Sequence, residues 1–229
     1  MKLADILFTQ GFGTRYDCNR LIEAGMVSIG GQTVDDPFFE ADVAELTFAV
    51  GGVEWPYREK AIIALNKPAG YECSLKPSAH PSVMTLIPAP LRKRNVQPVG
   101  RLDVDTTGLL LLTDDGALLH RLIHPKRHVE KSYIATLKHP VTEKMLSMLR
   151  QGVTLADDPI PVAARTAEAL GERTLELVLT QGKYHQVKRM VAACSNRVEA
   201  LHRNRFGKLV LPDTLPEGEW IWVKQEDIL

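Results

Sequence analysis

An uninterrupted run of leucines constrains the fold more than any other feature of this sequence. The stretch GRLDVDTTGLLLLTDDG, residues 100–116, places four consecutive leucines between two polar segments. The run does not alternate between apolar and polar residues, and it is too short for a buried helix. It therefore predicts a strand that is covered on both faces. A chain of 229 residues is long enough to bury such a strand in a core.

Other segments from residue 61 onward predict a mixture of strands and helices. We expect strands in segments 61–67, 131–137, 174–180 and 219–223, and helices in segments 141–152 and 186–194. The elements do not follow a regular strand–helix–strand order, which is typical of parallel sheets. The predicted fold class is therefore α+β, with a mostly antiparallel mixed sheet.

The first 58 residues predict a separate small α/β module. Two short apolar helices come first, and a capping box at Thr14–Asp17 begins the second helix. A hairpin follows, with Gly30 and Gly31 at its turn. A glycine pair at positions 51–52 and Pro56 mark a linker. We therefore expect two domains, residues 1–58 and 59–229.

Charge is distributed unevenly between these two segments, although the formal net charge of the chain is zero. Residues 1–58 contain four Lys/Arg and nine Asp/Glu, whereas residues 59–229 contain 24 Lys/Arg, 19 Asp/Glu and all seven histidines. The basic segment is the candidate for contact with nucleic acid.

The cysteines and the hydropathy pattern indicate a cytoplasmic protein. Cys18, Cys73 and Cys194 are odd in number and far apart, so they predict neither a disulfide framework nor a zinc site. Asp5 interrupts any signal-peptide core, and no apolar run approaches the length of a membrane span. We expect no membrane partner.

The acidic loop before the leucine run is the first candidate for chemistry. A carboxylate of Asp103 or Asp105 would be held firmly by the buried strand behind it, as a catalytic group should be. The structural alternative is that both aspartates cap a turn. A metal site with Asp114 and Asp115 is disfavoured, because the strand separates the two acidic pairs by about 30 Å at roughly 3.3 Å per residue.

Two basic segments are the other candidates. QGKYHQVKRMV, residues 181–191, gathers hydrogen-bond donors at a helix start, although an ordinary solvated basic helix start has the same pattern. HPKRHVEKSYIATL, residues 124–137, brings basic residues next to Tyr133, which could stack on an unstacked base or simply pack in the core. The histidines at 120, 124 and 128 do not predict a metal site, because Pro125 breaks their helix.

Residues 3–37 resemble the S4 RNA-binding domain, whose second helix and following turn contact RNA. Only Arg15 and Arg20 offer positive charge in the matching helix here. Because affinity for RNA rises with the number of phosphates that are neutralised, we expect this module to bind RNA weakly by itself. The alternative is a purely structural module.

The segments GRLDVDTTGLLLLT, EKSYIATL and GKYHQVKRM, preceded by LNKPAGY and the S4-like module, together resemble the RsuA family of pseudouridine synthases. The resemblance covers essentially the whole chain and implies a pseudouridine synthase catalytic domain in residues 59–229. It places the family's catalytic aspartate on Asp103, its stacking tyrosine on Tyr133 and the basic partner of the aspartate on Lys188. It also places on Arg101 the arginine that displaces the target nucleotide, and on Leu211 an apolar wall.

The resemblance implies a site-specific rRNA-modifying isomerase that converts uridine to pseudouridine. Substrate and product are isomers, so we expect no cofactor and no metal; the carboxylate could act as nucleophile or as base. The expected partner is 16S rRNA or a 30S assembly intermediate, with uridine 516 as the target. We expect a monomer. Further RNA contacts are expected from the residues Arg15, Arg20, Lys183, His185 and Arg189.

Two alternatives from the same sequence remain open. The first is a paralogous synthase that acts on a uridine of 23S rRNA. The second is a non-catalytic RNA-binding protein of ribosome assembly, which would have no need for Asp103 opposite Lys188. A metal-dependent glycosyltransferase or nuclease is disfavoured by the distance between the acidic pairs.

Overall fold

The computed structural model describes residues 1–156 and 158–229, and it divides the chain into two units. Unit 1 comprises residues 1–61 and 87–96, and unit 2 comprises residues 62–86 and 97–229. The fold is α+β with mostly antiparallel sheets, as predicted. No helix in the described part of the chain is long and apolar enough to cross a membrane.

Unit 1 contains a four-stranded sheet with strand order β2-β1-β3-β4 and three short helices. Its elements are α1 (Leu3–Thr9), α2 (Arg15–Glu23), β1 (Val27–Ile29), β2 (Gln32–Thr33), β3 (Thr47–Val50), β4 (Val53–Pro56) and α3 (Ala89–Lys93). The predicted capping box is present: Thr14 accepts from the amide of Asp17, and the Asp17 carboxylate accepts from the amide of Thr14. The predicted hairpin is also confirmed, with both turn glycines at positive φ.

Helix α3 packs with unit 1, although the sequence analysis placed it in the second domain. Leu91 on α3 is fully buried, and the guanidinium of Arg94 donates to the side chain of Gln10 and to the carbonyl of Glu59. Gly11 has φ +86, and a Cβ there would collide with the carbonyl oxygen of Pro90. Only glycine therefore permits this approach of α1 to α3.

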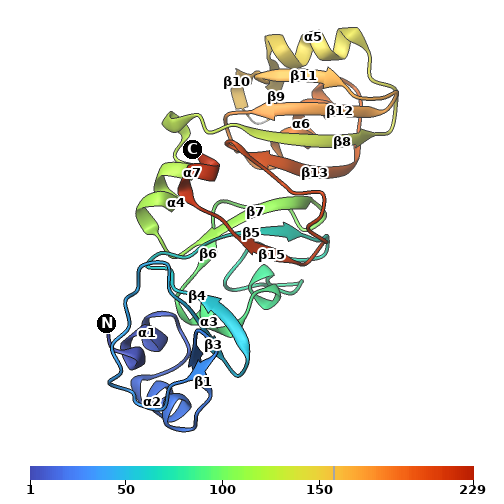
Figure 1. The fold of residues 1–229 in the computed structure, drawn as a ribbon. Coiled ribbons are helices and arrows are strands. Elements are labelled where there is room, and N and C mark those ends of the chain that lie inside the picture. Colours follow the sequence, from blue (N-terminus) through green and yellow to red (C-terminus); the bar gives the residue numbers. More distant parts are fainter. Residues whose placement is uncertain (157) are drawn as a thin grey trace. The chain divides into compact units, whose positions relative to one another are not determined.

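Unit 2 is built on a nine-stranded sheet whose main path is β11-β12-β8-β13-β7-β5-β15 (Figure 1). Neighbouring strands on this path are antiparallel, apart from the parallel pair β13 and β7. The strands are β5 (Ile62–Lys67), β6 (Gln97–Pro98), β7 (Thr107–Thr113), β8 (Lys131–Leu137), β11 (Thr166–Ala169), β12 (Thr174–Leu179), β13 (Val198–Phe206), β14 (Leu209–Val210) and β15 (Trp220–Trp222). A separate two-stranded sheet pairs β9 (Val153–Leu155) with β10 (Asp158–Val162).

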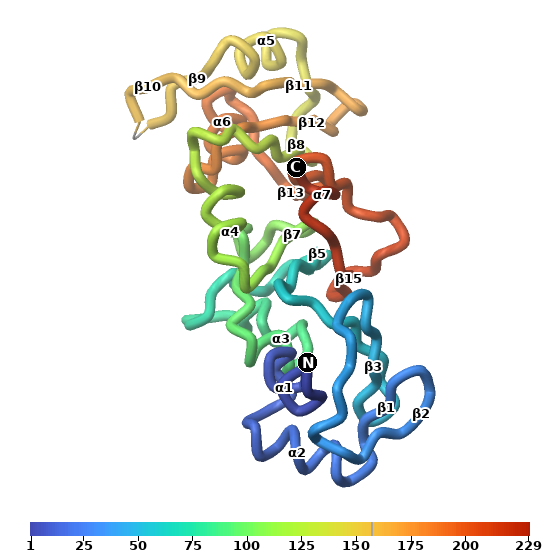
Figure 2. The backbone as a smooth tube through the Cα atoms, turned by 60° about the vertical axis from the view of Figure 1, so that its left-hand side comes forward, coloured from blue at the N-terminus to red at the C-terminus, as the bar shows by residue number. Residues whose placement is uncertain are grey.

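The helices of unit 2 cover two apolar cores. They are α4 (Gly116–Ile123), α5 (Glu143–Gln151), α6 (Gln186–Ala193) and α7 (Gln225–Ile228), with 3-10 turns at Val83–Leu86 and Pro125–Arg127. Helices α5 and α6 share one core with β8, β12 and β13, while α4 and α7 share the other with β5 and β7. Figure 2 shows α5 and α6 near β8 and β12, and α4 near β7. Each core holds one part of the sheet rigid.

Strand β7 confirms the prediction made from the leucine run. Leu109, Leu110, Leu111 and Leu112 are all fully buried. Leu109 and Leu111 belong to the core with α4, whereas the alternate leucines point to the opposite face of the strand. The sequence of the strand does not alternate between apolar and polar residues because both of its faces are covered. At its far end, Asp115 caps α4 by accepting hydrogen bonds from the amides of Ala117 and Leu118.

Candidate active site

Asp103 lies in the loop that leads into β7, and a buried lysine holds this loop in place. Lys67, at the end of β5, is completely buried. Its Nζ donates to the carbonyl oxygens of Asp103, Val104 and Thr106 at 3.1, 3.3 and 2.8 Å, and to Pro68 at 3.0 Å. Burial lowers the pKa of this ammonium, and the nearby negative charges oppose that effect. Lys67 therefore holds the loop through its backbone carbonyl oxygens. It does not occupy the carboxylate of Asp103, which can contact other groups.

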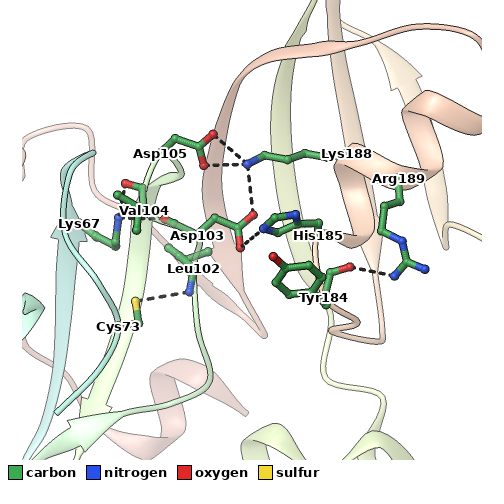
Figure 3. Close-up of polar contacts among 10 residues, drawn as sticks. All are labelled: Lys67, Cys73, Leu102, Asp103, Val104, Asp105, Tyr184, His185, Lys188 and Arg189. Carbon is green, nitrogen blue, oxygen red and sulfur yellow. Dashed lines mark hydrogen bonds and ion pairs between the residues drawn. The ribbon is translucent and has the colours of Figure 1, made fainter. Parts of the chain in front are cut away.

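The carboxylate of Asp103 faces two basic groups from the start of helix α6 (Figure 3). Lys188 Nζ lies 3.3 Å from Oδ2 of Asp103, and His185 Nε2 lies 3.4 Å from Oδ1. The Asp103 side chain is 28% exposed, so the group is reachable from solvent. The structure thus brings together two segments that are more than 80 residues apart in the chain.

Lys188 also binds Asp105, and this second carboxylate positions the lysine. Its Nζ donates to both carboxylate oxygens of Asp105, at 2.7 and 2.9 Å (Figure 3). Burial disfavours the charged form of Lys188, but the hydrogen bond to Asp105 and the charges of both aspartates outweigh it and raise the pKa. The same hydrogen bond lowers the pKa of Asp105. Lys188 therefore stays cationic beside Asp103.

A small cavity of about 70 Å³ opens at Asp103. Tyr133 from β8 forms part of its wall, together with the apolar side chains Leu179, Val187 and Leu201. Tyr133 is half-buried and also packs against the core that contains α5 and α6. Tyr133 therefore packs partly in the core, as one interpretation expected, and it also lines the cavity, while its stacking on a base stays a prediction. An apolar wall, an aromatic ring and a paired carboxylate together suit a planar polar ligand.

Most of the expected site residues lie around this cavity. Arg101, Lys183 and His185 line it with Asp103 and Tyr133, and Lys188 lines an adjoining hollow of about 410 Å³ that also includes Arg101. Lys183 forms an ion pair with Asp158, which offsets much of its charge. Arg101 is exposed, lines both hollows with Asp103, and has no acidic partner among the described residues.

Four expected residues line neither this cavity nor the adjoining hollow. Leu211 is buried in the core with α4 and α7, so it is not the apolar wall, which Leu201 and Leu179 form instead. Arg189 points back to donate to the carbonyl of Tyr184 (Figure 3). In unit 1, Arg15 is paired with Asp5 and lies over the ring of Phe8. Arg20 is exposed on α2.

Sequence reasoning missed two residues that shape the site. It assigned no role to Lys67, because a lysine at the end of a strand is ordinarily solvated. It considered Asp105 as a turn cap or metal ligand and not as the partner of Lys188. The signal for Lys67 was its place in the otherwise apolar segment AIIALNKP, where a charged residue has to be paired or hydrogen-bonded.

Comparisons with known proteins agree with this architecture. The sequence profile described as RNA pseudouridylate synthase matches residues 61–193. The chain is 37% identical over 216 residues to "Ribosomal small subunit pseudouridine synthase A" of Haemophilus influenzae, covering 94% of this chain and 92% of that protein. It is 34% identical over 232 residues to the protein of the same name from Escherichia coli, covering 100% of this chain and 98% of that protein.

A solved structure is also similar along the whole chain. It is titled "Crystal structure of pseudouridylate synthase", and it superposes with a TM-score of 0.70 at 34% sequence identity, covering 99% of this chain and 97% of that chain. The matched profile spans the acidic loop, Tyr133 and the start of α6, which are the elements that converge on the cavity. The chain belongs to the RNA pseudouridylate synthase family, whose members are isomerases that act on RNA.

Proposed function

We propose that this protein converts uridine 516 of 16S rRNA to pseudouridine and that Asp103 is the catalytic group. The observation that carries the proposal is the solvent-accessible carboxylate of Asp103, held next to Lys188 and His185 at the mouth of a cavity that Tyr133 lines. The choice of RNA rests on the relatives, which are named for the ribosomal small subunit.

The chemistry of the reaction fits a single carboxylate. The bond between C1′ of the ribose and N1 of uracil breaks, the base turns, and C1′ joins C5, whose proton is then lost as N1 gains one. No electron is gained or lost overall, so the reaction requires no redox group. An ionised Asp103 either attacks as a nucleophile or removes a proton to begin cleavage. The ammonium of Lys188, 3.3 Å from Oδ2 of Asp103, places a positive charge beside this carboxylate.

The walls of the cavity fit the uracil ring. A uridine in folded RNA has to leave its stack, which costs a few kcal/mol. Stacking on Tyr133 offsets about 1–3 kcal/mol of that cost. Arg101 is exposed at the cavity and carries a planar guanidinium that can occupy the space left in the RNA stack. Leu179 and Leu201 supply apolar contacts to the edge of the ring.

Mapping pseudouridine in both ribosomal RNAs, with and without this gene, tests the target. Carbodiimide treatment stops reverse transcription at pseudouridine, and we expect one stop, at uridine 516 of 16S rRNA, to disappear when the gene is removed. Loss of a stop in 23S rRNA instead would identify the paralogous activity. An unchanged pattern in both RNAs would contradict the proposed function.

A further inference from the structure

A second, larger cavity of about 250 Å³ adjoins the first one. The two cavities share Arg101, Tyr133 and Lys183 among their lining residues. Apolar side chains, including Ile123 and Phe206, form much of the wall of the second cavity. Neither Asp nor Glu is among the described residues that line it, although four of those residues are cationic. The cavity therefore combines apolar walls with an excess of positive charge.

Arg203 on β13 lines this cavity and carries a buried donor without a hydrogen-bond partner among the described residues. The residue is only 2% exposed, and its Nε donates to the carbonyl of Leu109 at 2.7 Å. Its Nη2 is buried and has no hydrogen-bond partner among the residues that the structure describes. The guanidinium lies 5.3 Å from the ring centroid of Phe206, which partly compensates its charge. A buried donor without an acceptor is uncommon and calls for a partner such as a water molecule or an anion.

Lys131 on β8 adds a second cation, and it has no acidic partner among the residues that the structure describes. Its Nζ donates to the carbonyl of Val129 at 2.9 Å, and it lies 5.2 Å from the ring centroid of Phe206. Burial, together with the smaller effect of the charge of Arg203, lowers the pKa of Lys131 to about 8. Two cations that repel each other in a partly desolvated cavity favour the binding of an anion.

We propose that this second cavity binds the phosphate of the RNA nucleotide next to the target uridine, with Arg203 and Lys131 as the donors. Arginine and lysine are the side chains that bind phosphate most often, and neither Arg203 nor Lys131 is ion-paired with a carboxylate of the described residues. Because Tyr133 and Arg101 line both cavities, a strand whose uridine occupies the first cavity reaches the second within one nucleotide. The apolar walls then contact the sugar of that nucleotide. This inference rests on the proposed function.

A chemical double-mutant cycle tests the contact. The substrate is a short RNA that carries one neutral methylphosphonate, placed in turn on each side of the target uridine. The variants are Lys131→Met, Lys131→Arg and the control Lys144→Met, which removes the same charge from an exposed position on α5. For the wild type, one methylphosphonate should weaken RNA binding about tenfold. Lys131→Met should lose less affinity than the wild type when that phosphate is replaced by a methylphosphonate, because only Arg203 then remains to sense its charge. Lys131→Arg and Lys144→Met should lose as much affinity as the wild type does.

Two further readouts separate a binding lysine from a structural one. Lys131→Met should lower the dependence of log affinity on log salt by about 0.7, the value for one phosphate of a single strand. It should also raise the melting temperature near neutral pH, because it removes a desolvated charge beside Arg203. A purely structural lysine would lower the melting temperature. Equal sensitivity of the wild type and Lys131→Met to every methylphosphonate would overturn the proposal.

Inorganic phosphate distinguishes RNA from a small phosphate as the source of the anion. If phosphate stabilises the wild type and not Lys131→Met, while RNA binds both proteins equally, the cavity holds a small anion and the RNA contact is wrong. The binding measurements do not depend on whether the protein isomerises the RNA. Coupling between Lys131 and one methylphosphonate in an RNA that is not isomerised would support the contact and contradict only the proposed function.

Discussion

At the scale of single residues, the site depends on one ammonium shared between two carboxylates. Lys188 lies closer to the exposed Asp105 than to Asp103, at 2.7 Å against 3.3 Å. The side chain of Asp105 is 71% exposed and does not line the smaller cavity. The geometry therefore indicates different tasks, with Asp105 fixing the lysine and Asp103 facing the substrate.

Replacing Lys188 tests this division. We expect Lys188→Met to lower kcat about 10²-fold, because two adjacent carboxylates then face each other without a cation. Lys188→Arg should retain more activity, since a guanidinium carries the same charge and can bind both carboxylates. Single-turnover rates at saturating RNA measure the effect on chemistry alone. Activity of Lys188→Met near that of the wild type would show that the ion pair is not needed.

At the scale of elements, the parallel pairing of β7 with β13 links the acidic loop to the strand that carries Leu201 and Arg203. The register sets Gly108 opposite Arg203. Gly108 has φ +101, and a Cβ there would collide with the backbone of Arg203. The two strands can be neighbours at this point only because residue 108 has no side chain.

Gly108→Ala should therefore disrupt the sheet next to the site. We expect the free energy of unfolding to fall by about 1–3 kcal/mol from strain at positive φ, with a further loss from the steric collision. Denaturant unfolding measures this change. Gly116→Ala is the matched control, because a Cβ at that position meets nothing within 4 Å and φ there is not positive. Equal stability of the two variants would contradict the close approach.

The elements also show what the sequence can predict. Strand β7 and helices α5 and α6 were predicted because short-range patterns specify them: a leucine run, an amphipathic repeat and an apolar helix face. The pairing of Asp103 with Lys188 was predicted from the family resemblance. No local sequence pattern indicates it, because only the fold brings these two residues together. Lys67 and Arg203 were missed for the same reason, since burial of a cation is a tertiary property.

At the scale of the whole molecule, the charge difference between the two units is smaller than the sequence suggested. Helix α3 brings Arg92, Lys93 and Arg94 into unit 1. Unit 1 then contains eight Lys/Arg and ten Asp/Glu, a net charge of −2, whereas residues 1–58 alone carry −5. Arg94 is held by Gln10 within the unit. The expectation that unit 1 resembles an S4 domain and binds RNA weakly stays a prediction.

Two arginines of unit 1 distinguish RNA binding from a purely structural role. Arg20→Ala should weaken RNA binding more than Arg15→Ala, because Arg15 is already paired with Asp5 whereas Arg20 is exposed. Fluorescence anisotropy with an RNA fragment at several salt concentrations measures both effects. If neither variant changes affinity or its salt dependence, these arginines of unit 1 do not contact the RNA.

The most direct test of the central claim compares Asp103→Asn with Asp105→Asn. Release of tritium from C5 of labelled uridine reports formation of the new C1′–C5 bond, and a 16S rRNA fragment that contains uridine 516 serves as substrate. We predict that Asp103→Asn loses at least about 10³-fold in single-turnover rate while it still binds the RNA, and that Asp105→Asn loses about tenfold or less. Comparable tritium release by Asp103→Asn and the wild type would contradict the account.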